Sequence, residues 1–390
     1  MKILIIWAES VNRYTGGSSH FWGLMRGIKS IGWGVRAIAP RYGRAEVTRH
    51  EDVSFFPLPP RSIISFTLLQ ILTVLCLPYW LVKHRPEVVY VRACFLAFLI
   101  YPICRLTGVL LIAEVDAIVE EEIRMRGQRR ILAHTLRFFN KLNYRWVDGM
   151  VCVTSGIREE LIRRGANPKT TIVIHNAAET SIMYPMNQKD ARRQFGLDEH
   201  VYIVGFAGTF SSWQGLDLLI QAAKQVLEHS DRPVQFVLVG DGQCHQELQE
   251  MVDKLQLGRF VSFLAPVPFE QVAAFNNACD VIVIPIHDRR KLRYGISPLK
   301  FWDAVSVGVP VLVPEGSQLE DVLEHLRLPG TFRAGDTEDL AEEILQVLSN
   351  TEHHQARRKD VHKIVSEQYS WTRVAEKLAE HCRRVGMRTK

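Results

Sequence analysis

Several sequence patterns that mark well-known classes of protein are missing from this chain. None of its seven cysteines forms a CxxC pair, and their scattered positions indicate a reducing compartment, not a disulfide framework or a structural zinc site. No GxGxxG opens a predicted first helix, which disfavours a nicotinamide oxidoreductase. The apolar run at the start is short and soon meets Glu9, so a first strand is expected there in place of a signal peptide. No repeat and no recognisable nucleic-acid-binding module is present.

The composition is that of a globular protein with an uneven charge distribution. A chain of 390 residues, 47% apolar and 23% charged, is long enough for two domains with separate cores. Residues 1–175 hold 24 Lys and Arg against 13 Asp and Glu, a net charge of +11, whereas residues 176–390 hold 24 against 29, a net charge of −5. A basic first half suggests a polyanionic neighbour: nucleic acid, an anionic membrane face or a phosphorylated substrate.

Short apolar strands alternate with amphipathic helices along the whole chain, which predicts an α/β fold of two doubly wound, Rossmann-like parallel sheets facing a cleft. The first domain is expected over 1–178, the second over 179–365, and a final helix within 366–390 is expected to pack back toward the first domain. Predicted strands lie at 2–8, 35–39, 88–92, 108–115, 149–154 and 171–174, then at 201–206, 234–239, 260–264, 281–285 and from 309.

The stretch 284–313, IPIHDRRKLRYGISPLKFWDAVSVGVPVLV, holds the densest chemistry in the sequence. A strand ends at Pro285, four cations follow, and a Gly-Ile-Ser-Pro turn opens a helix that carries Lys300 and Asp303. Free amides at a helix start, together with the helix dipole, favour an anion such as a diphosphate, and Asp303 could accept hydrogen bonds from sugar hydroxyls. A solvated basic loop followed by a helix with a surface ion pair is an equally good interpretation of this stretch alone. The four cations are Arg289, Arg290, Lys291 and Arg293.

Acidic residues follow the strand predicted at 108–115. Glu114 and Asp116 lie at its carboxyl end, where doubly wound sheets bind ligands, and the run Glu120–Glu122 comes just beyond. Capping of the next helix is the competing explanation, and it suits the glutamate run better than it suits Asp116.

Two segments of the first domain suggest a membrane surface. Residues 62–82 carry no charge and are long enough to span a bilayer, but Pro78 is expected to break a spanning helix, so an interfacial or buried helix is expected. Residues 123–146 are basic and aromatic, as in helices that bind anionic lipid, although a solvated helix face would show the same pattern.

With these elements in place, the sequence resembles the retaining glycosyltransferases of family 4, which have the two-domain GT-B fold. The matching segments are Gly16-Gly17, Asn176–Glu179, GFAGTFSSWQGLDLLIQA from Gly205, LVGDGQ from Leu238, and SPLKFWDA from Ser297 followed by Gly308-Val309-Pro310. The resemblance covers nearly the whole chain and rests on the order and spacing of these segments.

The sequence departs from the family pattern at several positions. Relatives commonly place a sugar-contacting glutamate eight positions before the helix acid, where this chain has Gly295, and the acid itself is Asp303 instead of glutamate. An Arg and a Lys that usually hold the donor diphosphate correspond to Thr209 and Gln214, and a histidine of the first domain corresponds to Asp116. The loop cations and Lys300 are expected to replace the two lost cations.

The resemblance implies transfer of a hexosyl or N-acetylhexosaminyl group from a nucleotide-diphosphate sugar, with retention and without a metal or other cofactor. Lys300 and Asp116 are the candidate catalytic residues. The expected partners are the donor, a lipid-linked or saccharide acceptor in envelope polysaccharide or glycolipid synthesis, and an anionic membrane, with no nucleic acid; the expected location is peripheral on the cytoplasmic face. A non-catalytic GT-B-fold binding or scaffold subunit is the alternative. The candidate donor-binding residues are Gly16, Gly17, Gly208, Thr209, Gln214, Arg293, Ser297, Leu299, Lys300 and Asp303.

Overall fold

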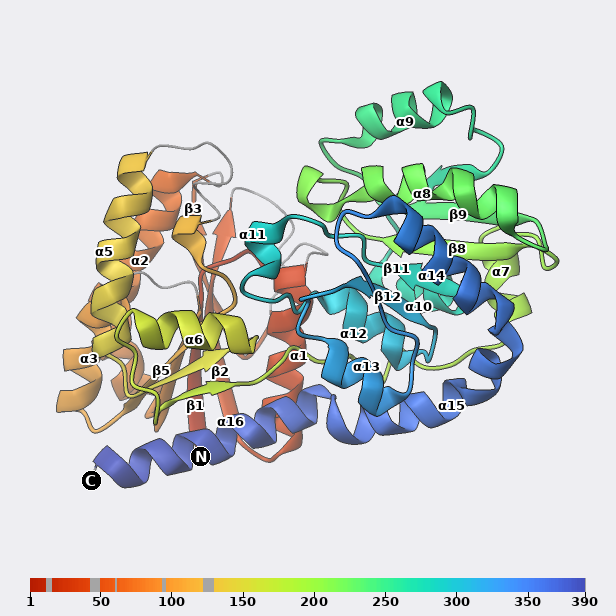
Figure 1. Cartoon of the computed structure of the whole chain (residues 1–390). Coiled ribbons are helices and arrows are strands. Elements are labelled where there is room, and N and C mark those ends of the chain that lie inside the picture. The colour runs from red at the N-terminus through yellow and green to blue at the C-terminus, as the bar shows by residue number, and fades with distance from the viewer. Residues whose placement is uncertain (12–15, 43–49, 60–61, 93–95, 122–129, 390) are drawn as a thin grey trace. The chain divides into compact units, whose positions relative to one another are not determined.

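The computed structural model describes residues 1–11, 16–42, 50–59, 62–92, 96–121 and 130–389. The chain divides into two compact units: unit 1 is Met1–Asn176 together with Trp371–Lys390, and unit 2 is Ala177–Ser370. Each unit is built on a single parallel sheet flanked by helices (Figure 1). The predicted α/β class with two doubly wound sheets is therefore confirmed.

Unit 1 contains a seven-stranded sheet in the order β3-β2-β1-β4-β5-β6-β7. The inner strand β1 pairs in parallel with β2 and with β4, so that Ile5 lies opposite Ala37 on one side and Tyr90 on the other. Its strands are β1 (Lys2–Trp7), β2 (Gly34–Tyr42), β3 (Val53–Leu58), β4 (Val88–Arg92), β5 (Leu110–Val115), β6 (Gly149–Cys152) and β7 (Thr171–Val173). Strand β3 was not predicted, because VSFFPL contains a proline and follows polar residues; Pro57 is tolerated because β3 is an edge strand.

The helices of unit 1 form two groups. Helices α1 and α16 pack closely together, and α16 also contacts β5 and β6 (Figure 1). Helices α2, α3 and α5 form the second group, in which α3 contacts both of the others. The helices are α1 (Gly16–Ser30), α2 (Ile63–His84), α3 (Ala97–Leu106), α5 (Arg130–Arg145), α6 (Ser155–Arg163) and α16 (Trp371–Thr389).

Close packing of α1 on α16 depends on two glycines. A Cβ atom added at Gly23 would lie 2.2 Å from Nε1 of Trp371, and one added at Gly27 would lie 2.2 Å from the Trp371 backbone oxygen. The Trp371 ring is buried and also lies 4.9 Å, centroid to centroid, from His20. The final helix is thus an integral part of unit 1.

Helix α2 is continuous through Pro78, contrary to the expectation that this proline would break it. Pro78 is exposed, so the helix can lose one backbone hydrogen bond on its solvent side without burying an unpaired carbonyl. Ser62 and Ser65 form a reciprocal capping box at the start, and Arg85 closes the end in a left-handed conformation. Within the described residues, α2 is the one helix long and apolar enough to cross a membrane.

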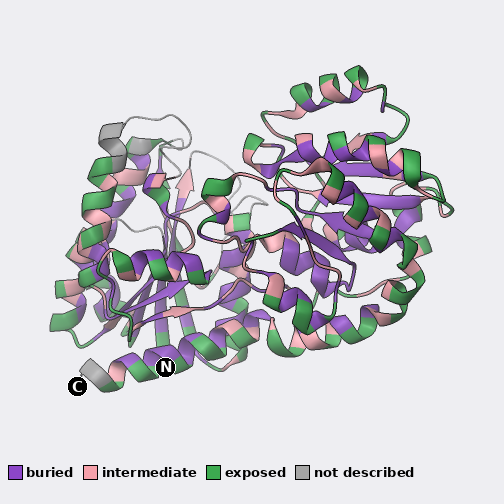
Figure 2. Cartoon of the chain, in the orientation of Figure 1, coloured by how far each residue is buried: buried purple, intermediate pink, exposed green. Residues whose placement is uncertain are grey.

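Unit 2 contains a six-stranded parallel sheet in the order β10-β9-β8-β11-β12-β13. Successive side chains point to opposite faces, so Ile203 belongs to one core and Val204 to the other. Figure 2 shows the strands buried between helices with exposed outer faces. The strands are β8 (Tyr202–Ala207), β9 (Val234–Val239), β10 (Val261–Leu264), β11 (Val281–Val283), β12 (Val311–Pro314) and β13 (Thr331–Phe332).

The helices of unit 2 cover both faces of its sheet. Helices α8 and α14 pack together over one core, while α10, α12 and α15 border the other. The helix predicted to carry Lys300 and Asp303 is α12, whereas α7, α11, α13 and α15 were not predicted. The helices are α7 (Gln188–Gln194), α8 (Leu216–His229), α9 (His245–Lys254), α10 (Phe269–Ala278), α11 (Arg289–Leu292), α12 (Leu299–Ser306), α13 (Glu320–Leu326), α14 (Thr337–Ser349) and α15 (Thr351–Gln368), with a 3₁₀ turn, η1 (Ser212–Gln214).

Each sheet has one point where the strand order reverses, and such points bind ligands at the carboxyl ends of the strands. In unit 1 this point lies between β1 and β4, and in unit 2 it lies between β8 and β11. Most of the predicted site residues follow these strands, whereas Asp116 follows β5, the strand next to β4.

Candidate functional site

Lys300 is the central side chain of the candidate site in unit 2. It lies in the first turn of α12, and its Nζ donates a hydrogen bond to Oε1 of Gln214, 3.0 Å away in η1. The same ammonium group lies 3.8 Å from the centroid of the Phe206 ring in β8, as a cation–π contact. Three elements therefore converge on one amine at the switch point of the sheet.

Burial shifts the pKa values of both titratable groups on the inner side of α12. It lowers the pKa of Lys300 to about 7, because its ammonium form loses hydration against Phe206 and Gln214. Burial, with a smaller contribution from nearby Glu179, raises the pKa of Asp303 to about 8. An amine with so little solvation for its charge gains strongly when an anion arrives, and a protonated Asp303 can donate a hydrogen bond.

Gly208 brings the backbone against the amine. Its φ is +152°, and an added Cβ would lie 2.5 Å from Nζ of Lys300, so only glycine allows this approach. The structure therefore brings the predicted residues Gly208, Gln214 and Lys300 into contact. Thr209, the next residue, is exposed.

The start of α12 has no side-chain cap. Pro298 stands at the N-cap position, where its backbone carbonyl accepts a hydrogen bond from the Phe301 amide but its side chain cannot cap the helix. The first-turn residues Leu299 and Lys300 follow it. Ser297 is engaged locally, because its Oγ accepts a hydrogen bond of 3.2 Å from Nε1 of Trp302. Backbone amides and a buried amine are thus close together at this helix end.

The loop cations differ in how they are held. Arg290 is paired at 2.9 Å with Asp288, which also caps the short helix α11, and Lys291 lies 4.5 Å from the centroid of Trp213. Arg293 is exposed, with its guanidinium 5.5 Å from the Tyr294 ring. The expectation that all four cations replace the family's diphosphate-binding pair stays a prediction; in this structure Arg290 has a local partner.

The space beside Gly295 is occupied by another side chain. Gly295 has φ +71°, and a Cβ added there would lie 2.5 Å from Oε1 of Gln318. A larger residue at position 295 would therefore need both a strained backbone and a displaced Gln318. This contact is a physical reason for the departure from glutamate at this position.

Arg92 organises the candidate site in unit 1. It ends β4, lies 4.4 Å from the Trp7 ring, and pairs with Asp116 directly after β5 and with Glu9 after β1, the latter at 3.3 Å. It also lies 3.5 Å from Glu114. Although burial opposes its charge, these three carboxylates raise the pKa of Arg92.

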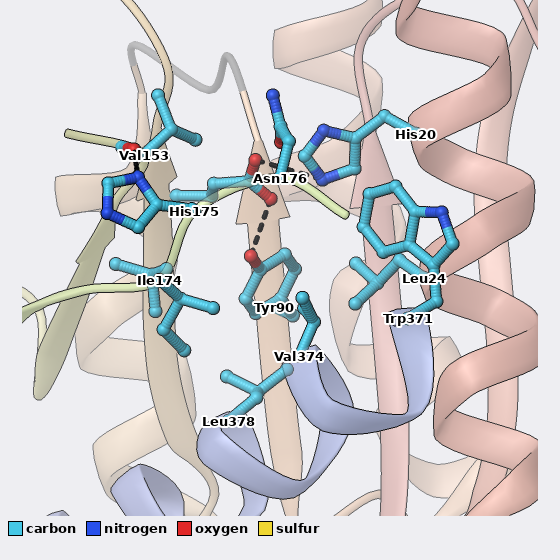
Figure 3. A pocket seen from close by; sticks show the side chains of 12 residues that line it. His20, Leu24, Tyr90, Val153, Ile174, His175, Asn176, Trp371, Val374 and Leu378 are labelled. Atoms are coloured by element: carbon cyan, nitrogen blue, oxygen red, sulfur yellow. Dashed lines mark hydrogen bonds and ion pairs between the residues drawn. The ribbon is translucent and has the colours of Figure 1, made fainter. Parts of the chain in front are cut away.

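Glu114 is held as a buried carboxylate by its neighbours. It accepts a hydrogen bond of 2.5 Å from the Tyr90 hydroxyl, and its other oxygen lies 3.1 Å from Nε2 of His20 (Figure 3). Burial alone would raise its pKa, but His20, Arg92 and Tyr90 together lower it to about 2. Glu114, His20 and Tyr90 line a small pocket together with His175, Asn176 and Trp371 (Figure 3).

The predicted residues of unit 1 are only partly brought together. Asp116 is one-third exposed and bound to Arg92, so its free oxygen can orient a hydroxyl. Gly16 and Gly17 open α1, and an added Cβ at Gly17 would lie 2.0 Å from Oε2 of Glu9. The structure therefore places Gly17 beside the carboxylate of Glu9.

Two glutamates of the acidic run beyond Asp116 pair with Arg164, and capping of the next helix by this run stays a prediction. Glu120 is fully buried and pairs with Arg164, and it also accepts a hydrogen bond of 3.1 Å from Asn140 of α5. Glu121 lies 3.8 Å from Arg164. Glu122 and most of the predicted basic segment before Arg130 lie outside the described residues. The described glutamates of this run therefore hold α5 and α6 together.

Sequence reasoning missed several residues that the structure adds to the site. Arg92 could have been found, because a charged residue ending the apolar strand VVYVR must lie at the sheet's carboxyl edge. No sequence signal identified Phe206 as the ring beneath Lys300, or Gln318 as the neighbour of Gly295. Both are contacts between segments far apart in the chain. Among the described residues, no group of three or more His, Cys, Asp or Glu side chains could hold a metal ion.

Comparison with solved structures agrees with this fold. Sucrose-phosphate synthase from Thermosynechococcus elongatus superposes with a TM-score of 0.80 over 100% of both chains at 16% identity. HepE of Anabaena, in complex with UDP and glucose, gives a TM-score of 0.70 over 97% of this chain and 98% of that chain at 18% identity. At such low identity these likenesses show the fold alone.

Curated sequences match over part of their length. The D-inositol 3-phosphate glycosyltransferase of Corynebacterium aurimucosum is 26% identical over 174 residues, which are 42% of this chain and 40% of that protein. The gpi3 subunit of phosphatidylinositol N-acetylglucosaminyltransferase from Schizosaccharomyces pombe is 27% identical over 236 residues, 59% of this chain and 47% of that protein. The matches thus span less than half the length of these two relatives.

Two family models match the chain one after the other. "Glycosyl transferase 4-like domain" matches residues 15–177, all but the last of which fall in unit 1, and "Glycosyl transferases group 1" matches residues 187–364, which fall in unit 2. Together the two models cover most of the chain and show that it belongs to the group 1 and 4-like family of glycosyltransferases.

Proposed function

We propose that this protein transfers a sugar from a nucleotide-diphosphate donor to an acceptor hydroxyl, with retention of the anomeric configuration. Unit 2 binds the donor and unit 1 binds the acceptor. The observation that carries the proposal is the Lys300 ammonium, enclosed by Phe206, Gln214 and Gly208 at the switch point of the unit 2 sheet. A buried, poorly solvated cation beside helix amides is a site for a compact anion.

Relatives support a nucleotide sugar as the source of that anion. HepE of Anabaena was solved in complexes with UDP, with UDP and glucose, and with UDP-glucose. Starch synthase IV of Arabidopsis thaliana was solved with ADP and acarbose. The donor sugar of this protein is proposed to be a hexosyl or N-acetylhexosaminyl group, in line with the N-acetylglucosaminyltransferase named among the relatives.

The reaction breaks the bond between the anomeric carbon and the diphosphate oxygen and forms a bond from that carbon to the acceptor oxygen on the same face. Negative charge develops on the leaving diphosphate, and Lys300 with the amides of Leu299 and Lys300 stabilises it. The acceptor proton passes to the leaving diphosphate. Asp303 holds the ribose, and Asp116, fixed by Arg92, orients the acceptor hydroxyl. No resident metal or other cofactor is included in this scheme.

The acceptor is proposed to be borne by a membrane, as a lipid-linked saccharide or glycolipid precursor, with the protein peripheral on the cytoplasmic face. An exposed apolar stripe runs along α2 in unit 1 at spacings of three and four residues, which is one face of a helix. Its members, which we call the α2 stripe, are Ile64, Leu68, Ile71, Leu75, Tyr79 and Val82.

The neighbouring helices of unit 1 add the charge that an anionic surface requires. Helix α5 exposes Arg137, Lys141 and Arg145 together with Phe138 and, just past its end, Trp146. Helix α3 contacts both α2 and α5, so the stripe and these cations belong to one helical group. Apolar insertion with a basic flank is the pattern of interfacial helices.

Donor turnover tests the proposed activity. We expect wild-type protein to release nucleoside diphosphate from at least one compound among UDP-glucose, UDP-N-acetylglucosamine, GDP-mannose and ADP-glucose, slowly with water and faster with membrane extract. Lys300→Ala is expected to lower this turnover at least about 100-fold, the scale of losing a principal charge stabiliser. Lys254→Ala, an exposed lysine of α9, is the matched control and should retain wild-type turnover.

Two outcomes would contradict the proposal. Near-normal turnover of Lys300→Ala would remove Lys300 from the mechanism. Binding of nucleotide sugars without any turnover, with or without membrane extract, would favour the non-catalytic subunit, which the neutral Thr209 and Gln214 make the relevant alternative.

A further inference from the structure

The turn between β12 and α13 holds a glutamine in a backbone conformation that its chain position does not explain. Four described non-glycine residues have positive φ: Arg85, Gln256, Gln318 and Arg327. Three of them close helices, since Arg85 and Arg327 are C-caps and Gln256 follows the last turn of α9. Gln318, with φ +64°, instead comes before helix α13, in the turn that follows strand β12.

The backbone fixes this turn against the loop that leads into α12. The amide of Ile296 donates to the Ser317 backbone oxygen at 2.8 Å, and Ser317 is fully buried. Ser317 Oγ accepts from the Leu319 amide at 3.3 Å, which holds the residues on both sides of Gln318. The turn and the loop follow the paired parallel strands β12 and β11, so both lie at the ligand-binding edge of the sheet.

The side chain of Gln318 is directed onto Gly295. A Cβ added at Gly295 would meet Oε1, Cδ and Cγ of Gln318 at 2.5, 2.6 and 2.9 Å, so the carboxamide lies where a side chain of residue 295 would begin. Position 295 is glycine with φ +71°, and Gln318 is partly exposed. Gly295 and Gln318, which are neighbours in space and both left-handed, therefore place the neutral carboxamide of Gln318 beside the loop that leads into α12.

The chemistry of a carboxamide suits a sugar better than a phosphate. It presents two N–H donors and one carbonyl acceptor, which match hydroxyl groups that both donate and accept. Being uncharged, it is not suited to hold the diphosphate proposed to bind at Lys300. Sites built to bond a hydroxyl discriminate strongly against donors in which that hydroxyl is missing or differently oriented.

We propose that Gln318 binds a hydroxyl group of the transferred sugar and contributes to the choice of donor sugar. This inference rests on the proposed function of unit 2 as the donor-binding unit. In this inference Gln318 contacts the sugar of the donor, whereas Lys300 contacts its diphosphate. Left-handed residues outside helix ends are retained where the surrounding structure enforces them for binding.

The test compares two glutamines with the same backbone conformation. Gln318→Gly removes the carboxamide while glycine accepts φ +64°, and Gln256→Gly, at φ +57° beyond α9, is the matched control. Calorimetric dissociation constants are measured for UDP, GDP and ADP and for UDP-glucose, UDP-N-acetylglucosamine, GDP-mannose and ADP-glucose. Urea unfolding of both variants checks that each remains folded.

For the sugar nucleotide that wild type binds best, Gln318→Gly is expected to weaken binding about tenfold while changing the affinity for its nucleoside diphosphate less than about twofold. Gln318→Asn tolerates a left-handed backbone but shortens the side chain, so its carboxamide lies further from the loop. Its affinity for the sugar nucleotide is expected to lie between those of Gln318→Gly and wild type. Gln256→Gly should change neither affinity.

Equal losses for the nucleoside diphosphate and its sugar, or no loss for either, would overturn the role of Gln318 while leaving the proposed function in place. Failure of wild-type protein to bind any of the seven compounds would instead remove the proposed function and this inference with it. A loss confined to the sugar nucleotide supports the assignment.

Discussion

Lys300 shows how a single residue can be unfavourable for folding and favourable for binding. Its amine is enclosed by an aromatic ring, an amide oxygen and a glycine backbone, and burial lowers its pKa from 10.5 to about 7. Below pH 7 the folded state must carry the poorly solvated charge. An anion that reaches this site relieves that cost, because the ammonium then gains a partner.

This arrangement predicts how stability depends on pH. Between pH 7 and 10.5 the unfolded chain keeps the Lys300 proton that the folded protein releases, so the destabilising contribution of Lys300 shrinks as pH rises. The free energy of unfolding of wild type relative to Lys300→Met should therefore increase between pH 7 and pH 9, by about 1 kcal/mol per pH unit at most, since Lys300 as a residue is half-buried although its amine is enclosed.

Urea unfolding of both proteins at pH 6, 7.5 and 9, without nucleotide, measures this difference. Lys254→Met, at an exposed position, is the control and should show no such trend. A constant difference between wild type and Lys300→Met across this range would mean that the amine is hydrated like any surface lysine.

Residue types in this site were predictable, but their partners were not. Lys300 and Asp303 follow from a helix-opening turn after a buried strand, and the structure places them on α12 as expected. The partners lie far apart in the sequence: Phe206 and Lys300 are 94 positions apart, Arg92 and Asp116 are 24 apart, and Gln318 and Gly295 are 23 apart. Spacing along a sequence carries no record of such contacts, because they depend on which strands become neighbours.

At the scale of elements, α2 combines a buried face with an exposed apolar one. Ile64, Leu75 and Val82 are 77%, 69% and 76% exposed, whereas Leu69 and Leu77 on the inner face are buried. A helix that only completed a core would not expose such residues in a continuous row. The stripe is the physical basis of the proposed membrane contact.

Replacing Ile64, Leu75 and Val82 together by Ser should weaken binding to vesicles of phosphatidylcholine and phosphatidylglycerol at least about tenfold, because the inserted apolar area is lost. Flotation of vesicles measures the bound fraction. Phe260→Ser, which changes an apolar residue of unit 2 that is 41% exposed, is the control and should bind like wild type. Unchanged flotation of the triple variant would exclude the α2 stripe as the contact.

The sequence-based expectation for α2 was right about its length and wrong about its continuity. An uncharged run of 21 residues predicts a helix of this size, and the structure gives one. Pro78 was expected to end it, but a proline on an exposed helix face removes a hydrogen bond that water can replace. Exposure of that face depends on the packing of α2 against α3 and β3, which composition does not encode.

At the scale of the whole molecule, two units of similar construction share one rule: polar side chains gather where strand order reverses. In unit 1 the group is Glu9, Arg92 and Asp116, which carries more negative than positive charge. In unit 2 it is Lys300 with Gly208 and Gln214, centred on a cation. This difference in charge suits a hydroxylic acceptor in unit 1 and an anionic donor in unit 2.

The alternation of strands and helices predicted this whole-molecule plan well, because the periods of parallel strands and amphipathic helices are both visible in the sequence. The chain's return into unit 1 is less visible. It depends on Gly23 and Gly27, whose missing side chains admit Trp371. Glycines inside a helix allow close packing, but the sequence does not say which segment packs against them.

The central claim is that unit 2 binds the diphosphate of a nucleotide donor at Lys300. Isothermal titration of UDP, GDP and ADP into the full chain at pH 6.5 tests it most directly, with Lys300→Ala and Lys254→Ala titrated alongside. We expect at least one nucleoside diphosphate to bind wild type and Lys254→Ala equally, and to bind Lys300→Ala at least about tenfold more weakly. Equal affinity for Lys300→Ala and wild type, or no binding of any of the three to wild type, would contradict the claim.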